Sequence, residues 1–260
     1  LKNSEKGIIP ALQLAYKHSE GNWISRMDAD DRMPPQKLEL FAKHAQEGRL
    51  VTGKVKYFGE APVSEGYLRY ENWLNALTSE EYGIHVYREC VVASPNWLIS
   101  KEFFESFNWN SWKYPEDYDL CFNIYLQLVP LVVADKVVHH WYDHKHRTSR
   151  TSEVYRDQDF FDLKLDYFLQ KDVDTTKKCM LWGAGPRGKK LAKIMIDRGL
   201  EFDWVTDNDK KIGHIIYDQL IKPVPETLNW KACQVLVAIS GPSDQQEVVS
   251  KLKDKKGVEG

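Results

Sequence analysis

Short apolar runs alternate with amphipathic segments along most of this chain, and this alternation constrains the fold more than any other feature. In the first half, strand-like runs lie at 21–28, 50–58 and 131–142, and helical spacing of apolar side chains falls at 7–18 and 116–128. The same order restarts after Lys177, where the strand CMLWG leads through a glycine turn into the helix PRGKKLAKIMIDRG. Strands that alternate with helices predict an α/β fold with parallel sheets in both halves.

A polar segment without periodicity, KDVDTTKK, separates the two halves. We therefore predict a first domain over residues 1–172 and a small second domain over 173–260. A net charge of −2 argues against electrostatic binding to nucleic acid. No run approaches the roughly 18 apolar residues that a membrane-spanning helix needs. Four scattered cysteines without metal-binding spacing predict reduced thiols in a cytoplasmic protein. They are Cys90, Cys121, Cys179 and Cys233.

Three aspartates, Asp28, Asp30 and Asp31, follow the short strand-like stretch WISRM. In open α/β sheets, ligands bind beyond the carboxyl ends of strands. Clustered carboxylates resist joint ionisation unless a cation compensates their charge. Mg²⁺ or Mn²⁺ takes one or two carboxylates and completes its shell with substrate phosphates. A solvated turn, in which one aspartate caps the next helix, is the alternative, and for a DxDD pattern taken alone it is the better interpretation.

The longer stretch GIIPALQLAYKHSEGNWISRMDADD resembles the donor-site region of family 2 glycosyltransferases with the GT-A fold. In that family a helix is followed by a short strand that ends in the DxD motif. The resemblance implies that Asp28 contacts the ribose of a nucleotide-sugar donor or the metal shell, and that Asp30 holds the metal. Asp31 and Arg26 join Asp28 as predicted substrate-binding residues.

A second acidic segment, YPEDYDLCFN, opens the helix predicted after residue 115. Acids in the first turn of a helix are favoured by its dipole alone, which is the structural alternative. The segment also resembles the ED motif of the same family. The resemblance implies that Asp117 is the catalytic base, which must lie within hydrogen-bond reach of the acceptor hydroxyl. Glu116 would help to shape the acceptor site.

Four of the eight histidines lie in the stretch HHWYDHKHRTSR. Alone, such a loop also fits a solvated surface or adventitious metal binding. The family's YRxHxxxxS pattern matches Tyr142, His144 and Ser149, with Asp143 in place of the usual arginine. The resemblance implies that His144 binds the metal or the leaving diphosphate, and His140 is the second choice. The same loop would add positive charge through Lys145, Arg147 and Arg150.

In the second half, Gly183, Gly185 and Gly188 have GxGxxG spacing between a strand and a helix. Such glycines permit a tight turn and let backbone N–H groups approach a phosphate. Asp207, about twenty residues further on, follows the next strand, where a ribose-binding acid would lie. The pattern predicts a bound nucleotide, and a turn used only for packing is the alternative. The phrase VTDNDKKIG resembles small Rossmann-like domains appended to some bacterial glycosyltransferases and to sugar acyltransferases, where this domain binds a nucleotide sugar.

Together these resemblances imply a metal-dependent, inverting glycosyltransferase of the hexosyltransferase type. It would move a sugar from a nucleotide-diphosphate donor to a saccharide or lipid-linked acceptor in bacterial cell-surface polysaccharide synthesis. We expect it in the cytoplasm, with peripheral contact at the inner face of the membrane left open. The family's first strands and its DDGSTD-like segment are not found, so we expect a fragment of a longer protein. A non-catalytic nucleotide-sugar or dinucleotide binding protein is the alternative, and an NAD-dependent enzyme rests on the glycines alone.

Overall fold

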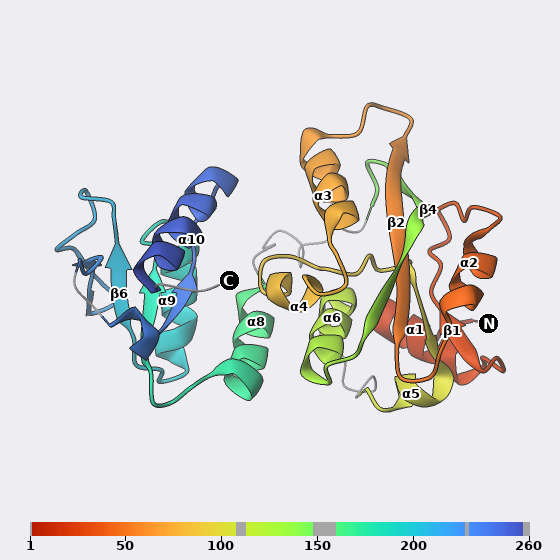
Figure 1. Cartoon of the computed structure of the whole chain (residues 1–260), viewed down its shortest axis with the longest axis horizontal. Helices are drawn as coiled ribbons and strands as arrows, with labels where there is room; N and C mark the ends of the chain where they lie inside the picture. Colours follow the sequence, from red (N-terminus) through yellow and green to blue (C-terminus); the bar gives the residue numbers. More distant parts are fainter. Residues whose placement is uncertain (1, 108–112, 148–159, 227–228, 257–260) are drawn as a thin grey trace. The chain divides into compact units, whose positions relative to one another are not determined.

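A computed structural model divides the chain into two compact units, Leu1–Asp157 and Gln158–Gly260. Figure 1 shows the elements of both units. In the described ranges, no helix combines the length and the apolar character needed to cross a membrane. The structure describes residues 2–107, 113–147, 160–226 and 229–256.

The first unit is built on a four-stranded mixed sheet with the order β1-β3-β2-β4. Strands β2 and β4 are parallel, whereas β3 runs antiparallel to both β1 and β2. The predicted parallel sheet is therefore wrong for β3, because alternation fixes the order of elements and not their direction. The unit contains α1 (Ile8–Lys17), β1 (Trp23–Ser25), α2 (Lys37–His44), β2 (Leu50–Gly59), α3 (Glu65–Ala76), α4 (Tyr82–His85), β3 (Trp97–Ser100), α5 (Lys101–Glu105), α6 (Glu116–Leu126) and β4 (Leu131–Asp143).

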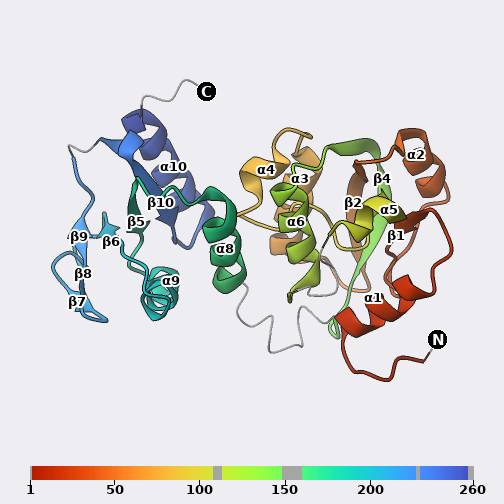
Figure 2. The same ribbon diagram turned by 90° about the horizontal axis from the view of Figure 1, so that it is seen from below.

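Helices cover both faces of this sheet. Helices α3 and α6 lie on one side and α2 lies on the other, as the two views show (Figures 1 and 2). Phe41 of α2 packs with Val51, Leu98 and Val138 from three of the strands. The side chain of Ser100 caps α5 by accepting a hydrogen bond from the backbone N–H of Phe103 at 3.2 Å. The packing of α2 against the sheet holds β4 beside the loop that follows β1.

The second unit has a four-stranded sheet with the order β10-β5-β6-β9, and all of its pairings are parallel. The predicted parallel α/β sheet is thus confirmed for this half. Helix α9 packs on one face and α10 on the other, as Figure 2 shows. The unit contains α8 (Phe161–Tyr167), a π-helical turn (Phe168–Asp172), β5 (Lys178–Trp182), α9 (Pro186–Asp197), β6 (Asp203–Thr206), β7 (Ile215–Ile216), β8 (Gln219–Leu220), β9 (Lys222–Pro223), a 3₁₀ turn (Trp230–Ala232), β10 (Cys233–Val237) and α10 (Pro242–Lys256).

The division between the units lies earlier in the chain than the boundary predicted after residue 172. Helix α8 accounts for the difference, because its apolar face belongs to the second core. Phe161 and Leu165 pack there with Leu191 of α9 and Trp204 of β6. The polar segment that suggested a linker therefore connects two elements of one unit.

Candidate functional site

Arg26 joins the two acidic motifs of the first unit. Its Nε donates to Asp28 Oδ1 at 2.7 Å, and its Nη1 donates to Glu116 Oε1 at 2.8 Å, although 90 residues separate Arg26 from Glu116. Glu116 has only 2% of its side chain exposed. A buried carboxylate requires a partner of opposite charge. The bridge therefore fixes the loop after β1 against the first turn of α6.

Asp117 lies beside this bridge and, together with Arg26 and Glu116, lines a cavity of about 250 Å³. Burial, and then the neighbouring charge of Glu116, raise the pKa of Asp117 to about 7. The backbone N–H of Tyr118 donates to Asp117 Oδ1 at 2.8 Å. A carboxylate that titrates near neutral pH is well suited to accept a proton.

Two polar atoms in this cavity lack a hydrogen-bond partner within the described part of the chain. They are Ser94 Oγ and Glu116 Oε2, and both are buried. Buried polar atoms are nearly always paired, so a ligand hydroxyl or a water is the natural partner for each. No motif pointed to Ser94, which lies in a buried turn before β3. The remaining lining is mainly apolar and comes from Leu12, Gln13, Ala15, Tyr16, Ser19, Ile24, Ser25, Met27, Trp97, Phe104 and Leu120.

Asp30 and His144 form a second pair at the rim of the acidic loop. Asp30 Oδ2 lies 2.9 Å from His144 Nε2, with the two side chains 48% and 24% exposed. This is the length of a hydrogen bond between the imidazole and the carboxylate, and the pair brings two groups of metal-ligating type together. Within the described ranges, no group of three or more His, Cys, Asp or Glu side chains could hold a metal. An ion held by this pair would take its other ligands from water and substrate phosphates.

Asp31 has a different environment from its neighbours. Its side chain is 1% exposed, and its Oδ2 lies 2.8 Å from His139 Nε2. Its Oδ1 accepts a hydrogen bond from the backbone N–H of Tyr142 at 2.8 Å. Both oxygens of this predicted substrate-binding residue are thus engaged within the protein.

The residues of the histidine loop differ in their environments. His139 and His140 lie on opposite faces of β4, as neighbours in a strand do, and the buried His139 meets the acidic loop. His140 contributes its backbone, which pairs with that of Arg32. The Cζ atom of the Arg147 guanidinium lies 5.1–5.6 Å from the centroids of three aromatic rings. The side chain of Lys145 is exposed. The predicted contributions of Ser149 and Arg150 lie outside the described residues.

Residues 1–107 match the family model described as Glycosyl transferase family 2. The match supports a family 2 glycosyltransferase over this part of the chain. The glycosyltransferase match includes Arg26 and the three aspartates, and it ends before Glu116 and Asp117. The Arg26 bridge is what connects the matched region with the second acidic motif.

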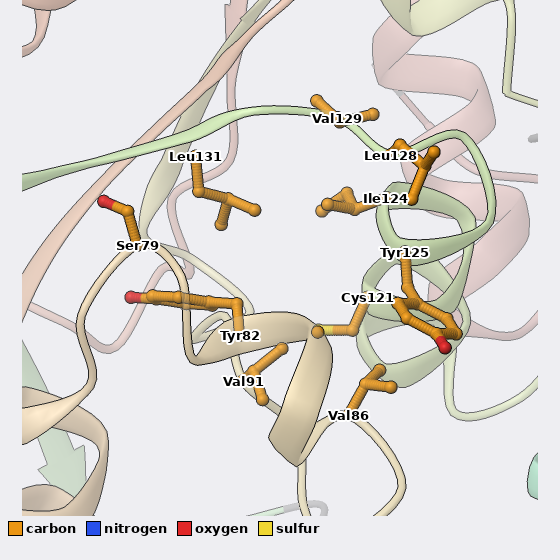
Figure 3. Close-up of a pocket in the computed structure, with 11 residues that line it drawn as sticks. Ser79, Tyr82, Val86, Val91, Cys121, Ile124, Tyr125, Leu128, Val129 and Leu131 are labelled. Carbon is orange, nitrogen blue, oxygen red and sulfur yellow. The ribbon is translucent and has the colours of Figure 1, made fainter. Parts of the chain in front are cut away.

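The first unit holds another cavity outside the glycosyltransferase motifs, shown in Figure 3. It has a volume of about 220 Å³ and is lined largely by apolar side chains of α4, α6 and the start of β4. Leu131, Val91 and Ile124 point into it, as does the thiol of Cys121. It contains none of the predicted site residues and no carboxylate, so its lining does not fit phosphate or metal chemistry.

In the second unit, the three glycines of the GxGxxG turn have different environments. A Cβ on Gly188 would lie 1.9 Å from the carbonyl oxygen of Gly183. Gly183 has a φ of +128°, and a Cβ there would lie 2.6 Å from the oxygen of Ala238. A Cβ on Gly185, at the N-terminus of α9, meets nothing within 4 Å. Asp207 follows β6, and its Oδ2 lies 3.2 Å from Lys251 Nζ.

Gly188→Ala is therefore expected to destabilise the second unit by about 3 kcal/mol or more, at the upper end of single-substitution effects. The backbone carbonyl of Gly183 cannot yield to the new methyl group without moving the turn. Gly185→Ala is the matched control and should cost less than about 1 kcal/mol, since Gly185 has an ordinary φ of −78°. Thermal unfolding of the two variants measures the difference. Equal melting temperatures would show that the turn does not need its third glycine.

Proposed function

We propose that this protein catalyses metal-dependent, inverting transfer of a hexosyl group from a nucleotide-diphosphate donor to a hydroxyl of a saccharide or lipid-linked acceptor in cell-surface polysaccharide synthesis. The observation that carries this proposal is the Arg26 bridge. It holds Asp28 and Glu116 within hydrogen-bond distance of one guanidinium, which supports a single site that contains both the donor motif and the acceptor motif. The family match over residues 1–107 supports the same class of reaction.

At the donor side of this site, Asp30 and His144 would hold Mg²⁺ or Mn²⁺. When bound, the cation offsets the negative charge of the departing diphosphate. Asp28 is 30% exposed beside Arg26, and in this proposal it orients the donor through the ribose. Arg26 keeps that carboxylate in place by binding it through the guanidinium edge.

At the acceptor side, Asp117 takes the proton of the attacking hydroxyl. Its pKa of about 7 means that it is largely ionised just above neutral pH yet still basic enough to accept a proton. The buried Glu116 Oε2 and Ser94 Oγ would bind other hydroxyls of the acceptor. A single base serves a single displacement, and attack from the face opposite the diphosphate inverts the anomeric carbon.

Asp30→Asn tests the donor half of this proposal. With the protein, a panel of nucleotide-diphosphate sugars and Mn²⁺, we expect turnover that EDTA removes and that falls by at least about 100-fold in Asp30→Asn, because a direct metal ligand should matter more than its supporting residues. Asp135→Asn is the matched control, since Asp135 lies exposed on β4 and pairs only with Lys54 among its described contacts. Turnover that persists in EDTA would contradict the proposal.

For the second unit we propose nucleotide binding at the GxGxxG turn. The observation in favour is the open space at Gly185, which would let a phosphate approach the N-terminus of α9. If this is the only ligand site, the protein is a non-catalytic nucleotide-sugar or dinucleotide binding protein. Calorimetric titration with nucleotide sugars and with NAD measures binding at this turn, and Gly185→Val should abolish that binding. If the first unit is a glycosyltransferase, the same variant should leave glycosyl transfer intact.

A further inference from the structure

A buried chain of polar side chains runs from α2 to the acidic loop. Lys37 Nζ donates to the carbonyl oxygen of Pro95 at 2.9 Å and lies 3.4 Å from His139 Nδ1. His139 Nε2 in turn lies 2.8 Å from Asp31 Oδ2. Lys37 and His139 are both buried. Neither the amphipathic pattern of α2 nor the predicted metal site accounts for a buried lysine here.

Lys37 and Asp31 lie on opposite sides of the His139 ring. When Lys37 is an ammonium group, which can only donate, Nδ1 of His139 accepts from Lys37 and Nε2 carries the proton that Asp31 accepts. A positive charge on Lys37 and a negative charge on Asp31 are then linked through a neutral imidazole. Such a pairing compensates two charges that could not be buried separately.

The network also fixes the position of the acidic loop on β4. The second oxygen of Asp31 accepts from the backbone N–H of Tyr142. Next to it, the backbones of Arg32 and His140 exchange two hydrogen bonds of 2.9 and 3.0 Å. Two residues after Tyr142 comes His144, whose Nε2 lies 2.9 Å from Asp30. Asp31 therefore ties together the two segments that carry the proposed metal ligands.

We propose that Lys37, His139 and Asp31 form a positioning network that sets Asp30 against His144, and that Asp31 acts through β4 and not on the donor. This inference rests on the proposed function, because it assumes that Asp30 and His144 hold the metal. It assigns a role to two residues that no motif identified, and it gives Asp31 a role different from the predicted substrate contact.

Binding of Mn²⁺ alone, followed by electron paramagnetic resonance, tests the inference without an activity assay. Asp31→Asn should weaken Mn²⁺ binding by about 10–100-fold, the range typical of residues that orient metal ligands. His139→Leu should do the same, whereas His139→Gln should keep affinity near that of the unmodified protein, because its amide N–H can replace the donor to Asp31. Asp135→Asn should have no effect, and circular dichroism checks that each variant is folded.

Three results would overturn the inference. If Asp30→Asn abolishes Mn²⁺ binding while Asp31→Asn and His139→Leu leave it unchanged, the network serves only stability. If Asp31→Asn abolishes binding as completely as Asp30→Asn while His139→Leu has no effect, Asp31 is itself a ligand. If Asp30→Asn leaves binding intact, the proposed metal site fails as well, which separates the two failures. Should Asp31→Asn not fold, the two His139 variants decide the question.

Discussion

Asp117→Asn is expected to lower the rate of glycosyl transfer by about 10²–10⁴-fold, the range that general acid–base catalysis supplies, and at the same time to raise the melting temperature at pH 8. The loss of rate follows because asparagine cannot accept the acceptor's proton. The gain in stability follows because burial opposes the charged carboxylate of Asp117 in the folded state. A role in catalysis that lowers stability is common at functional sites.

The effect of Asp117→Asn on folding stability depends on pH, because the pKa of Asp117 differs between the folded and the unfolded protein. The pKa of Asp117 is about 7 in the folded protein against an ordinary value of 3.8. The folded state therefore loses stability as pH rises from about 4 through 7, where the unfolded chain has already released its proton. Calorimetry should show that the advantage of Asp117→Asn at pH 8 shrinks at pH 5. In the unmodified protein, kcat/KM should fall about tenfold per unit below pH 7. A larger advantage at pH 5 than at pH 8 would contradict this explanation.

Arg26→Met is expected to lower the free energy of unfolding by about 3–5 kcal/mol, the usual effect of removing one partner from a buried ion pair. Glu116 would then hold a negative charge with no partner in a nearly closed environment. Glycosyl transfer should also be lost, because Asp28 and Glu116 would no longer be held together. Urea unfolding followed by tryptophan fluorescence measures the first effect.

The double variant Arg26→Met with Glu116→Gln separates charge from packing. It removes the unpaired charge, so it should recover much of the lost stability without recovering activity. If the double variant is as unstable as the single one, the loss of stability comes from packing around Arg26. In that case Arg26 does not stabilise the fold by compensating the buried charge of Glu116.

Local structure was largely predictable from the sequence because it depends on neighbouring residues. The helix predicted over 7–18 forms at Ile8–Lys17. The direction of β3 was not predictable, because pairing direction depends on how the buried coil before it returns to the sheet. The same holds for α8, whose amphipathic pattern does not say which core it will cover.

The candidate site was also predictable only where it depends on local sequence. The predictions for Asp30, Asp117 and His144 come from their positions at the ends of predicted elements together with the family resemblance. The contact between Arg26 and Glu116 could not be foreseen, since 90 residues lie between them. Lys37 was also missed, because a lysine in an amphipathic helix normally extends into solvent, and only the folded chain brings it to His139.

The most direct measurement is anomalous X-ray scattering from Mn²⁺ in crystals of the protein grown with a nucleotide-diphosphate sugar. A manganese peak within bonding distance of Asp30 Oδ2 and His144 Nε2, with the donor sugar between that ion and Asp117, is the predicted result. A peak at other residues, or a sugar that does not face Asp117, would contradict the assignment of both acidic motifs to one site of transfer.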